Sequence, residues 1–109
     1  MAEDFERLLA GIRDFDWNPR KRTSNLHDHK IDFEDVKGIF DGYHIIRRSD
    51  RHDEIRYEVF GYADNREVLV AFTIRGDVCW IISARRASRK ERRAFFQRLA
   101  RRSATEGKN

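Results

Sequence analysis

The chain of 109 residues has one cysteine, one proline and one methionine, and these scarcities exclude whole classes of protein. With Cys79 alone, an internal disulfide, a zinc site of paired cysteines and a Cys-x-x-Cys redox motif are all excluded. Long apolar runs are missing too, since no stretch reaches the roughly 20 residues of a membrane-spanning helix, and the N-terminus carries acids. We therefore expect a cytoplasmic protein that is neither secreted nor inserted in a membrane.

The remaining composition fits one compact domain. Apolar residues make up 39% of the chain and aromatic residues 12%, which is enough for a core at this length. Charged residues make up another 39%, with a formal net charge of +4. We expect a single domain over residues 15–102, preceded by a helical extension over 1–14 and followed by a disordered tail over 103–109.

Three helices and one brief strand are predicted before residue 43, the helices from apolar side chains at helical spacing. Asn18 and Asp32 are typical helix N-caps, and Pro19 is tolerated at the first helical position. The helices are expected at 5–12, 19–29 and 33–40, and the half-buried strand at 15–17.

From Tyr43 onward, β-branched and aromatic runs separated by short polar turns indicate an antiparallel meander. Its four strands are expected at 43–48, 55–63, 68–75 and 78–84. Ser88 and Glu91 then form a capping box that begins a last helix, whose stripe of Phe95, Phe96 and Leu99 is surrounded by arginines. We predict an α+β fold with N-terminal helices, a four-stranded sheet covered on one face, and a basic C-terminal helix.

Several short motifs between Phe15 and Phe96 repeat a known pattern. They are the segment Trp-Asn-Pro-Arg-Lys at 17–21, Asn25, His29, Phe33-Glu34, Glu54, Arg56, Gly61, the Arg-Gly-Asp turn at 75–77 and the stretch 81–93. The last stretch is the most specific, because few unrelated domains join such a strand end to a capped basic helix. Together these motifs resemble the BrnT family of bacterial toxins, the ribonuclease half of a toxin-antitoxin pair.

The resemblance implies a RelE-like fold and a metal-independent endoribonuclease, without a cofactor, that inhibits translation. It also implies neutralisation by a BrnA-like DNA-binding antitoxin, with DNA contacted indirectly and oligomers formed through that antitoxin. The chain departs from the family pattern at Asp28 (often lysine), Lys30 (glycine), Trp80 (arginine) and Phe95 (tyrosine). These departures leave open a second interpretation, a weak or inactive relative that binds nucleic acid or acts as a corepressor, and a third, a plain interaction domain.

Metal-free cleavage of RNA needs a base, an acid and cations around the phosphate, and five residues are candidates. Arg85 ends a strand beside a helix start, where a phosphate-binding side chain can be held rigidly, although a salt bridge would explain it too. Glu54 and Arg56 are predicted to share one strand face, as a base beside a phosphate binder or as members of an ordinary cross-strand ion pair. His29 and Lys21, two helical turns apart, could share a surface and transfer a proton, unless His29 only caps its helix.

The same arginine-rich region offers candidates for RNA binding. Trp80 could stack on an unpaired base, with Arg75 beside it or simply solvated in its turn. The other candidate phosphate contacts are Arg86, Arg89, Lys90 and Arg93. A solvated helix face or an acidic protein surface is the alternative reading of this basic block.

Two further features are interpreted as structural. His27 and His29 lie two residues apart, where helical side chains diverge, so no metal site is predicted. Cys79 lies in an apolar strand and is expected in the core rather than as a nucleophile.

Overall fold

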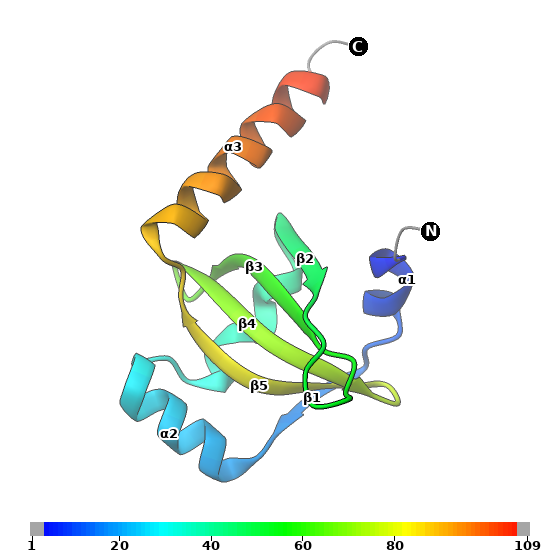
Figure 1. Cartoon of the computed structure of the whole chain (residues 1–109), viewed down its shortest axis with the longest axis vertical. Helices are drawn as coiled ribbons and strands as arrows, with labels where there is room; N and C mark the ends of the chain where they lie inside the picture. The colour runs from blue at the N-terminus through cyan, green and yellow to red at the C-terminus, as the bar shows by residue number, and fades with distance from the viewer. Residues whose placement is uncertain (1–3, 107–109) are drawn as a thin grey trace.

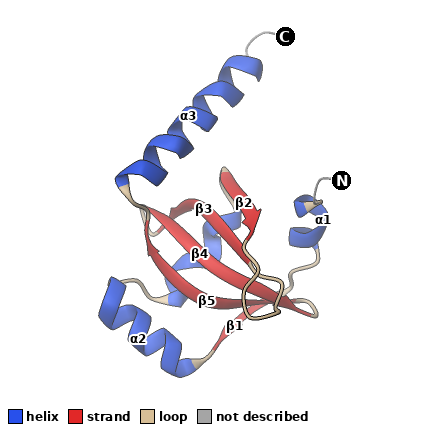
Figure 2. Cartoon of the chain, viewed as in Figure 1, coloured by secondary structure: helices blue, strands red, loops and turns tan. Residues whose placement is uncertain are grey.

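The structure is a computed structural model that describes residues 4–106, and it confirms the α+β class (Figure 1). Helices lie at both ends of the chain and the meander lies between them (Figure 2). The elements are α1 (Phe5–Ala10), β1 (Asp14–Trp17), α2 (Pro19–His29), the 3-10 helix η1 (Phe33–Phe40), β2 (His44–Arg48), β3 (Tyr57–Ala63), β4 (Arg66–Arg75), β5 (Val78–Arg86) and α3 (Arg89–Glu106).

The sheet has five strands in the order β1-β5-β4-β3-β2, so the predicted count of four is wrong by one. Strands β2 to β5 form the expected antiparallel meander. The fifth strand is the predicted segment at 15–17, now β1, which pairs in parallel with β5 and sets Phe15 opposite Cys79. A four-residue alternation predicts a strand but not its partner, because the pairing residues lie about sixty positions apart in the sequence.

Both faces of the sheet are covered, which corrects the expectation of one covered face. The first face carries the main core, where Val59, Val70 and Phe72 pack with Phe33 of η1 and with apolar side chains of α1 and β1. The second face carries a smaller cluster in which Phe95 of α3 packs on two strand residues, Phe60 and Leu69. Strand β4 has the burial pattern of a strand covered on both faces, since the consecutive residues Val68, Leu69 and Val70 are all buried.

Helix starts follow the predicted local chemistry. Asn18 Oδ1 accepts the Arg20 amide at 2.8 Å. Glu91 Oε1 accepts the Ser88 amide at 2.8 Å while Ser88 Oγ accepts the Glu91 amide at 3.1 Å, which confirms the capping box.

The third predicted helix begins behind its cap Asp32, but it is a 3-10 helix. Phe33, Val36 and Ile39 are its buried residues, and their spacing of three matches the three-residue turn of that helix. The predicted stripe placed Phe40 in this row, and Phe40 is half-buried instead.

The expected domain limits differ from the structure at both ends. Residues Phe5, Leu8 and Leu9 of α1 pack on the main core, so the N-terminal extension is joined to the domain. Helix α3 continues to Glu106, beyond the expected end at 102, because no helix breaker precedes Gly107. The rest of the expected tail, 107–109, lies outside the described residues.

Helix α3 leaves the body of the molecule as an arm (Figure 1). Phe95, 1% exposed, anchors its N-terminal half, whereas the neighbouring Phe96 is 43% exposed. The C-terminal half extends away from the sheet, and the longest dimension of the molecule is 47 Å. Among the described helices, none is long and apolar enough to cross a membrane.

Candidate nucleic-acid interface

A hollow of about 240 Å³ lies between the second face of the sheet and the first turns of α3. Phe60 and Leu69 belong to its apolar floor. Its charged lining is Arg47, Glu58, Glu91 and Arg98. We call this the sheet–helix hollow; two cations and two carboxylates lie around its apolar floor.

Arg85, near the end of β5, does not line the hollow itself, but its strand partner Leu69 and its ion-pair partner Glu91 both do. Its two terminal nitrogens donate to the two oxygens of Glu91 at 2.8 and 2.9 Å. These hydrogen bonds lower the pKa of Glu91 to about 2 and raise the pKa of Arg85, to which the charge of Glu58 adds a smaller contribution. Glu91 is therefore ionised at neutral pH and both holds Arg85 and caps α3.

Glu58 is the second carboxylate of the hollow, and the sequence analysis missed it. It pairs across the β2–β3 hairpin with Arg47, whose Nε and terminal nitrogen donate to one Glu58 oxygen at 2.9 and 2.6 Å. The Glu58 side chain is 20% exposed and that of Arg47 is 68% exposed, so the cation lies on the solvent side. A signal was present in the sequence, because Glu58 is the one charged residue in the β3 run Tyr-Glu-Val-Phe-Gly-Tyr-Ala.

A second charged cluster lies at the other end of the sheet. Arg56 Nε donates to Glu54 at 2.8 Å, and an Arg75 nitrogen lies 4.0 Å from the same carboxylate. The Arg75 guanidinium also stacks over the Trp80 ring, 4.1 Å from its centroid. We call Glu54, Arg56, Arg75 and Trp80 the stacking cluster; it offers an aromatic surface beside two cations.

The structure does not bring Arg85 and Arg56 together around one site. Strands β3 and β5 run in the same direction, because each is antiparallel to β4. The start of β3, next to Arg56, and the end of β5, at Arg85, therefore lie at opposite ends of the sheet. Each arginine has its own carboxylate, so a salt bridge, the alternative considered for Arg85, is what the structure shows there. Glu54 and Arg56 both precede β3 and pair with each other, so they neither share a strand face nor form a cross-strand ion pair as predicted.

The α2 candidates form a third group, on a helix that is hydrogen-bonded to β5. Lys21 and His29 are exposed and flank Asn25, each one helical turn away. Asn25 is buried and structural: its amide exchanges hydrogen bonds with the backbone of Ala84 at 2.8 and 3.0 Å, beyond the point where β1 ends. Within the described residues, no hydrogen bond or ion pair joins Lys21 or His29 to Arg85, Arg56 or Glu54.

The remaining basic candidates lie near the Arg85 end. These exposed residues, at the end of β5 and in the first turns of α3, are Arg86, Arg89, Lys90 and Arg93. Cys79 is 1% exposed, and burial raises the pKa of its thiol to about 12, as expected for a core residue. Among residues 4–106, no group of three histidine, cysteine or acidic side chains could hold a metal ion.

Comparisons with known proteins agree with this fold. Residues 17–91 match the model of a family described as the ribonuclease toxin BrnT of type II toxin-antitoxin systems. The crystal structure of the Brucella abortus ribonuclease toxin BrnT superposes with a TM-score of 0.56 at 23% identity, over 70% of this chain and 97% of that chain. No curated protein matched. Because the family match spans more than half of its length, the chain belongs to the BrnT family of ribonuclease toxins from type II toxin-antitoxin systems.

Proposed function

We propose that this chain is a metal-independent endoribonuclease that cleaves RNA at the sheet–helix hollow and thereby inhibits translation. The observation that carries the proposal is the convergence of two arginine–carboxylate pairs, Arg85–Glu91 and Arg47–Glu58, on one hollow of the sheet. Membership of a ribonuclease family supports it. Neutralisation by a BrnA-like DNA-binding antitoxin completes the proposed role.

In the proposed reaction, Glu58 is the general base in place of the sequence candidate Glu54. It removes the proton of a ribose 2′-hydroxyl, whose oxygen then bonds to phosphorus while the bond from phosphorus to the 5′-oxygen breaks. The 5′-oxygen takes a proton from solvent, and Glu58 later returns its own proton to solvent. The products are a 2′,3′-cyclic phosphate and a 5′-hydroxyl end.

Arg47 and Arg85 supply the positive charge that this reaction needs. A guanidinium binds phosphate with the same forked geometry that it uses for a carboxylate, so an incoming phosphodiester can replace one partner with the other. In this proposal Arg47 changes partner, since its side chain is 68% exposed to an incoming phosphate, and its departure leaves Glu58 free to accept a proton. Arg85 stays fixed by its two bonds to Glu91 and stabilises the negative charge that develops on the non-bridging phosphate oxygens.

The stacking cluster binds the RNA strand away from the cleaved bond. A base on the Trp80–Arg75 stack gains about 1–3 kcal/mol, and the gain depends little on sequence. Arg86, Arg89, Lys90 and Arg93 add phosphate contacts at the other end of the sheet. Unpaired RNA is the expected substrate, since stacking needs an exposed base.

The test is cleavage of a labelled single-stranded RNA by purified protein in the presence of a chelator. We expect wild-type protein to cleave and Glu58→Gln to lose most of the activity. The matched control is Glu34→Gln, which removes an exposed carboxylate paired with Lys37 on η1. Equal activity of Glu58→Gln and the control would refute the role of Glu58, and dependence on an added metal would refute the metal-free mechanism.

A second candidate function is a silent binding module or corepressor. The observation in its favour is that Arg85, Arg56 and Arg47 are all paired with carboxylates, which reduces the net positive charge offered to phosphate. Salt-sensitive RNA binding without cleavage by the wild-type protein would favour this function over the first.

A further inference from the structure

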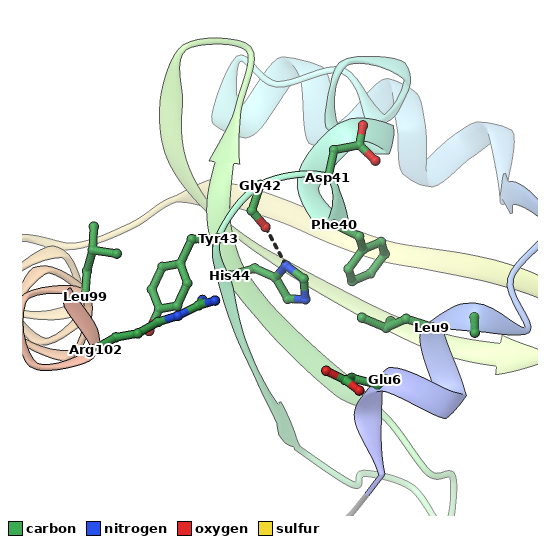
Figure 3. A pocket seen from close by; sticks show the side chains of 10 residues that line it. Glu6, Leu9, Phe40, Asp41, Gly42, Tyr43, His44, Leu99 and Arg102 are labelled. Carbon is green, nitrogen blue, oxygen red and sulfur yellow. Dashed lines mark hydrogen bonds between the residues drawn. The ribbon is translucent and has the colours of Figure 1, made fainter. Parts of the chain in front are cut away.

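A second and larger hollow, of about 900 Å³, lies between α1 and the C-terminal half of α3 (Figure 3). Leu9 of α1 lines one wall, and Leu99 and Arg102 of α3 line the other. Tyr43 and His44, at the start of β2, lie between the walls. We call this the α1–α3 groove; the residues that line it are distinct from those of the sheet–helix hollow.

We propose that the α1–α3 groove binds an acidic, amphipathic segment of a partner protein, the antitoxin of this toxin. The inference rests on the proposed toxin function and adds to it the surface through which the toxin is neutralised. Such a segment has an apolar side to fill the groove and carboxylates to meet the arginines of α3.

The groove presents apolar surface that a partner would cover. Leu9 and Leu99 face it from opposite walls, and Phe40 lines it as well. Outside the groove, Phe96 of α3 is 43% exposed and Tyr62 of β3 is 42% exposed, with their ring centroids 6.4 Å apart. Exposed apolar side chains of this kind are typical of a protein-binding surface.

The charge of α3 selects an acidic partner. Two acids, Glu91 and Glu106, stand in this helix, and Glu91 is bound to Arg85. The basic residues of the helix are Arg89, Lys90, Arg92, Arg93, Arg98, Arg101 and Arg102. A second copy of the chain would bring an equally basic helix against this one, so like-charge repulsion disfavours self-association at the groove.

The lining of the groove favours a protein segment over RNA. Glu6 and Asp41 place two carboxylates away from the α3 wall (Figure 3), where they can accept hydrogen bonds from the backbone amides of a peptide whose own acids lie at the α3 wall. A phosphodiester carries a charge at every unit, so it cannot keep its charge away from these two carboxylates. The Arg102 guanidinium lies 4.9 Å from the centroid of the Tyr43 ring, at the α3 wall, where it can meet a partner carboxylate (Figure 3). Apolar walls with a cation at one rim fit an amphipathic segment in the groove.

The experiment uses the complex of the full chain with the antitoxin encoded beside it, purified after co-expression. Arg102→Glu reverses the charge at the rim, and Leu99→Glu places a carboxylate in the apolar wall. We expect each variant to weaken antitoxin binding at least about tenfold, which is about 1.4 kcal/mol, in a titration. Arg20→Glu, an exposed charge reversal on α2, is the matched control and is expected to bind as the wild type does.

Two further readouts separate the alternatives. Hydrogen exchange of the complex should protect α1, the start of β2 and the C-terminal half of α3. Unchanged antitoxin affinity in Arg102→Glu and Leu99→Glu, protection over the second sheet face instead, or loss of RNA binding alone in Arg102→Glu would each overturn the inference. So would self-association of the free chain that Arg102→Glu abolishes.

RNA cleavage by the free protein tests the proposed function separately from the docking surface. We expect Arg102→Glu to cleave RNA as the wild type does, because Arg102 lies outside the sheet–helix hollow. If the wild type cleaves no RNA and Arg102→Glu still releases the antitoxin, the ribonuclease proposal fails and the docking surface stands. If RNA is cleaved and antitoxin affinity is unaffected, the opposite holds.

Discussion

The two ends of the sheet carry the same kind of ion pair in different surroundings. At the Arg85 end, the pair lies beside a hollow with an apolar floor and a second pair, Arg47–Glu58. At the Arg56 end, the pair lies beside an arginine stacked on Trp80. An arginine beside a glutamate is therefore not enough to define a site, because the same pair occurs at both ends and only its surroundings differ. We propose cleavage at the first end and strand binding at the second.

The largest expected effect is the loss of cleavage in Arg85→Ala. Removing one fixed cation from a developing phosphate charge should lower kcat by about 100- to 1,000-fold. Arg56→Ala is the matched comparison at the other end, and its kcat should stay near the wild-type value while KM rises. Single-turnover kinetics on a labelled RNA would measure both, and similar losses of kcat in the two variants would break the comparison.

A smaller effect is expected from Trp80→Ala in the stacking cluster. Loss of base stacking should weaken RNA binding by about 1–3 kcal/mol, with cleavage at saturating RNA unchanged. Fluorescence anisotropy at fixed salt would measure the affinity. Phe96→Ala is a useful control, because it removes an exposed aromatic ring from α3 rather than from this cluster. Unchanged RNA affinity in Trp80→Ala would show that the stacking cluster does not bind RNA.

The smallest effect concerns acid stability at the Arg85 end. The pKa of Glu91 is lowered from 4.5 to about 2, so its pairing stabilises the folded state above about pH 4.5. This contribution should be lost as the pH falls toward about 2, because Glu91 then becomes protonated in the folded protein as well. Thermal melting of wild type and Glu91→Gln between pH 7 and pH 2 would show the difference in melting temperature shrinking over that range. A constant difference would contradict the shifted pKa.

Local signals in the sequence predicted local structure well. The capping box of Ser88 and Glu91 depends on residues three positions apart, and the structure confirms it. Lys30 adopts a left-handed conformation with φ of 59° at the end of α2. This region favours glycine, so the lysine there carries a steric cost that glycine would avoid.

Contacts between segments far apart in the sequence could not be predicted from the sequence patterns. The partner of β1 and the contact between Arg47 and Glu58 depend on which strands become neighbours in the sheet. The alternation of apolar and polar residues within one strand does not identify its neighbour, because the same alternation fits any of them. The separation of Arg56 from Arg85 was missed for the same reason. Arg56 directly precedes β3 and Arg85 is the next-to-last residue of β5, so the directions of these two strands set the two arginines at opposite ends of the sheet.

The family, the α+β class, the helix starts and the basic character of the last helix could all be predicted from the amino-acid sequence. Each of them depends on residues that are close in sequence or on a short motif. The pairing of particular carboxylates with particular arginines, and the position of α3 between two separate hollows, became visible only in the folded structure. The physical reason is that an ion pair needs a few ångströms of proximity, which chain order alone does not specify.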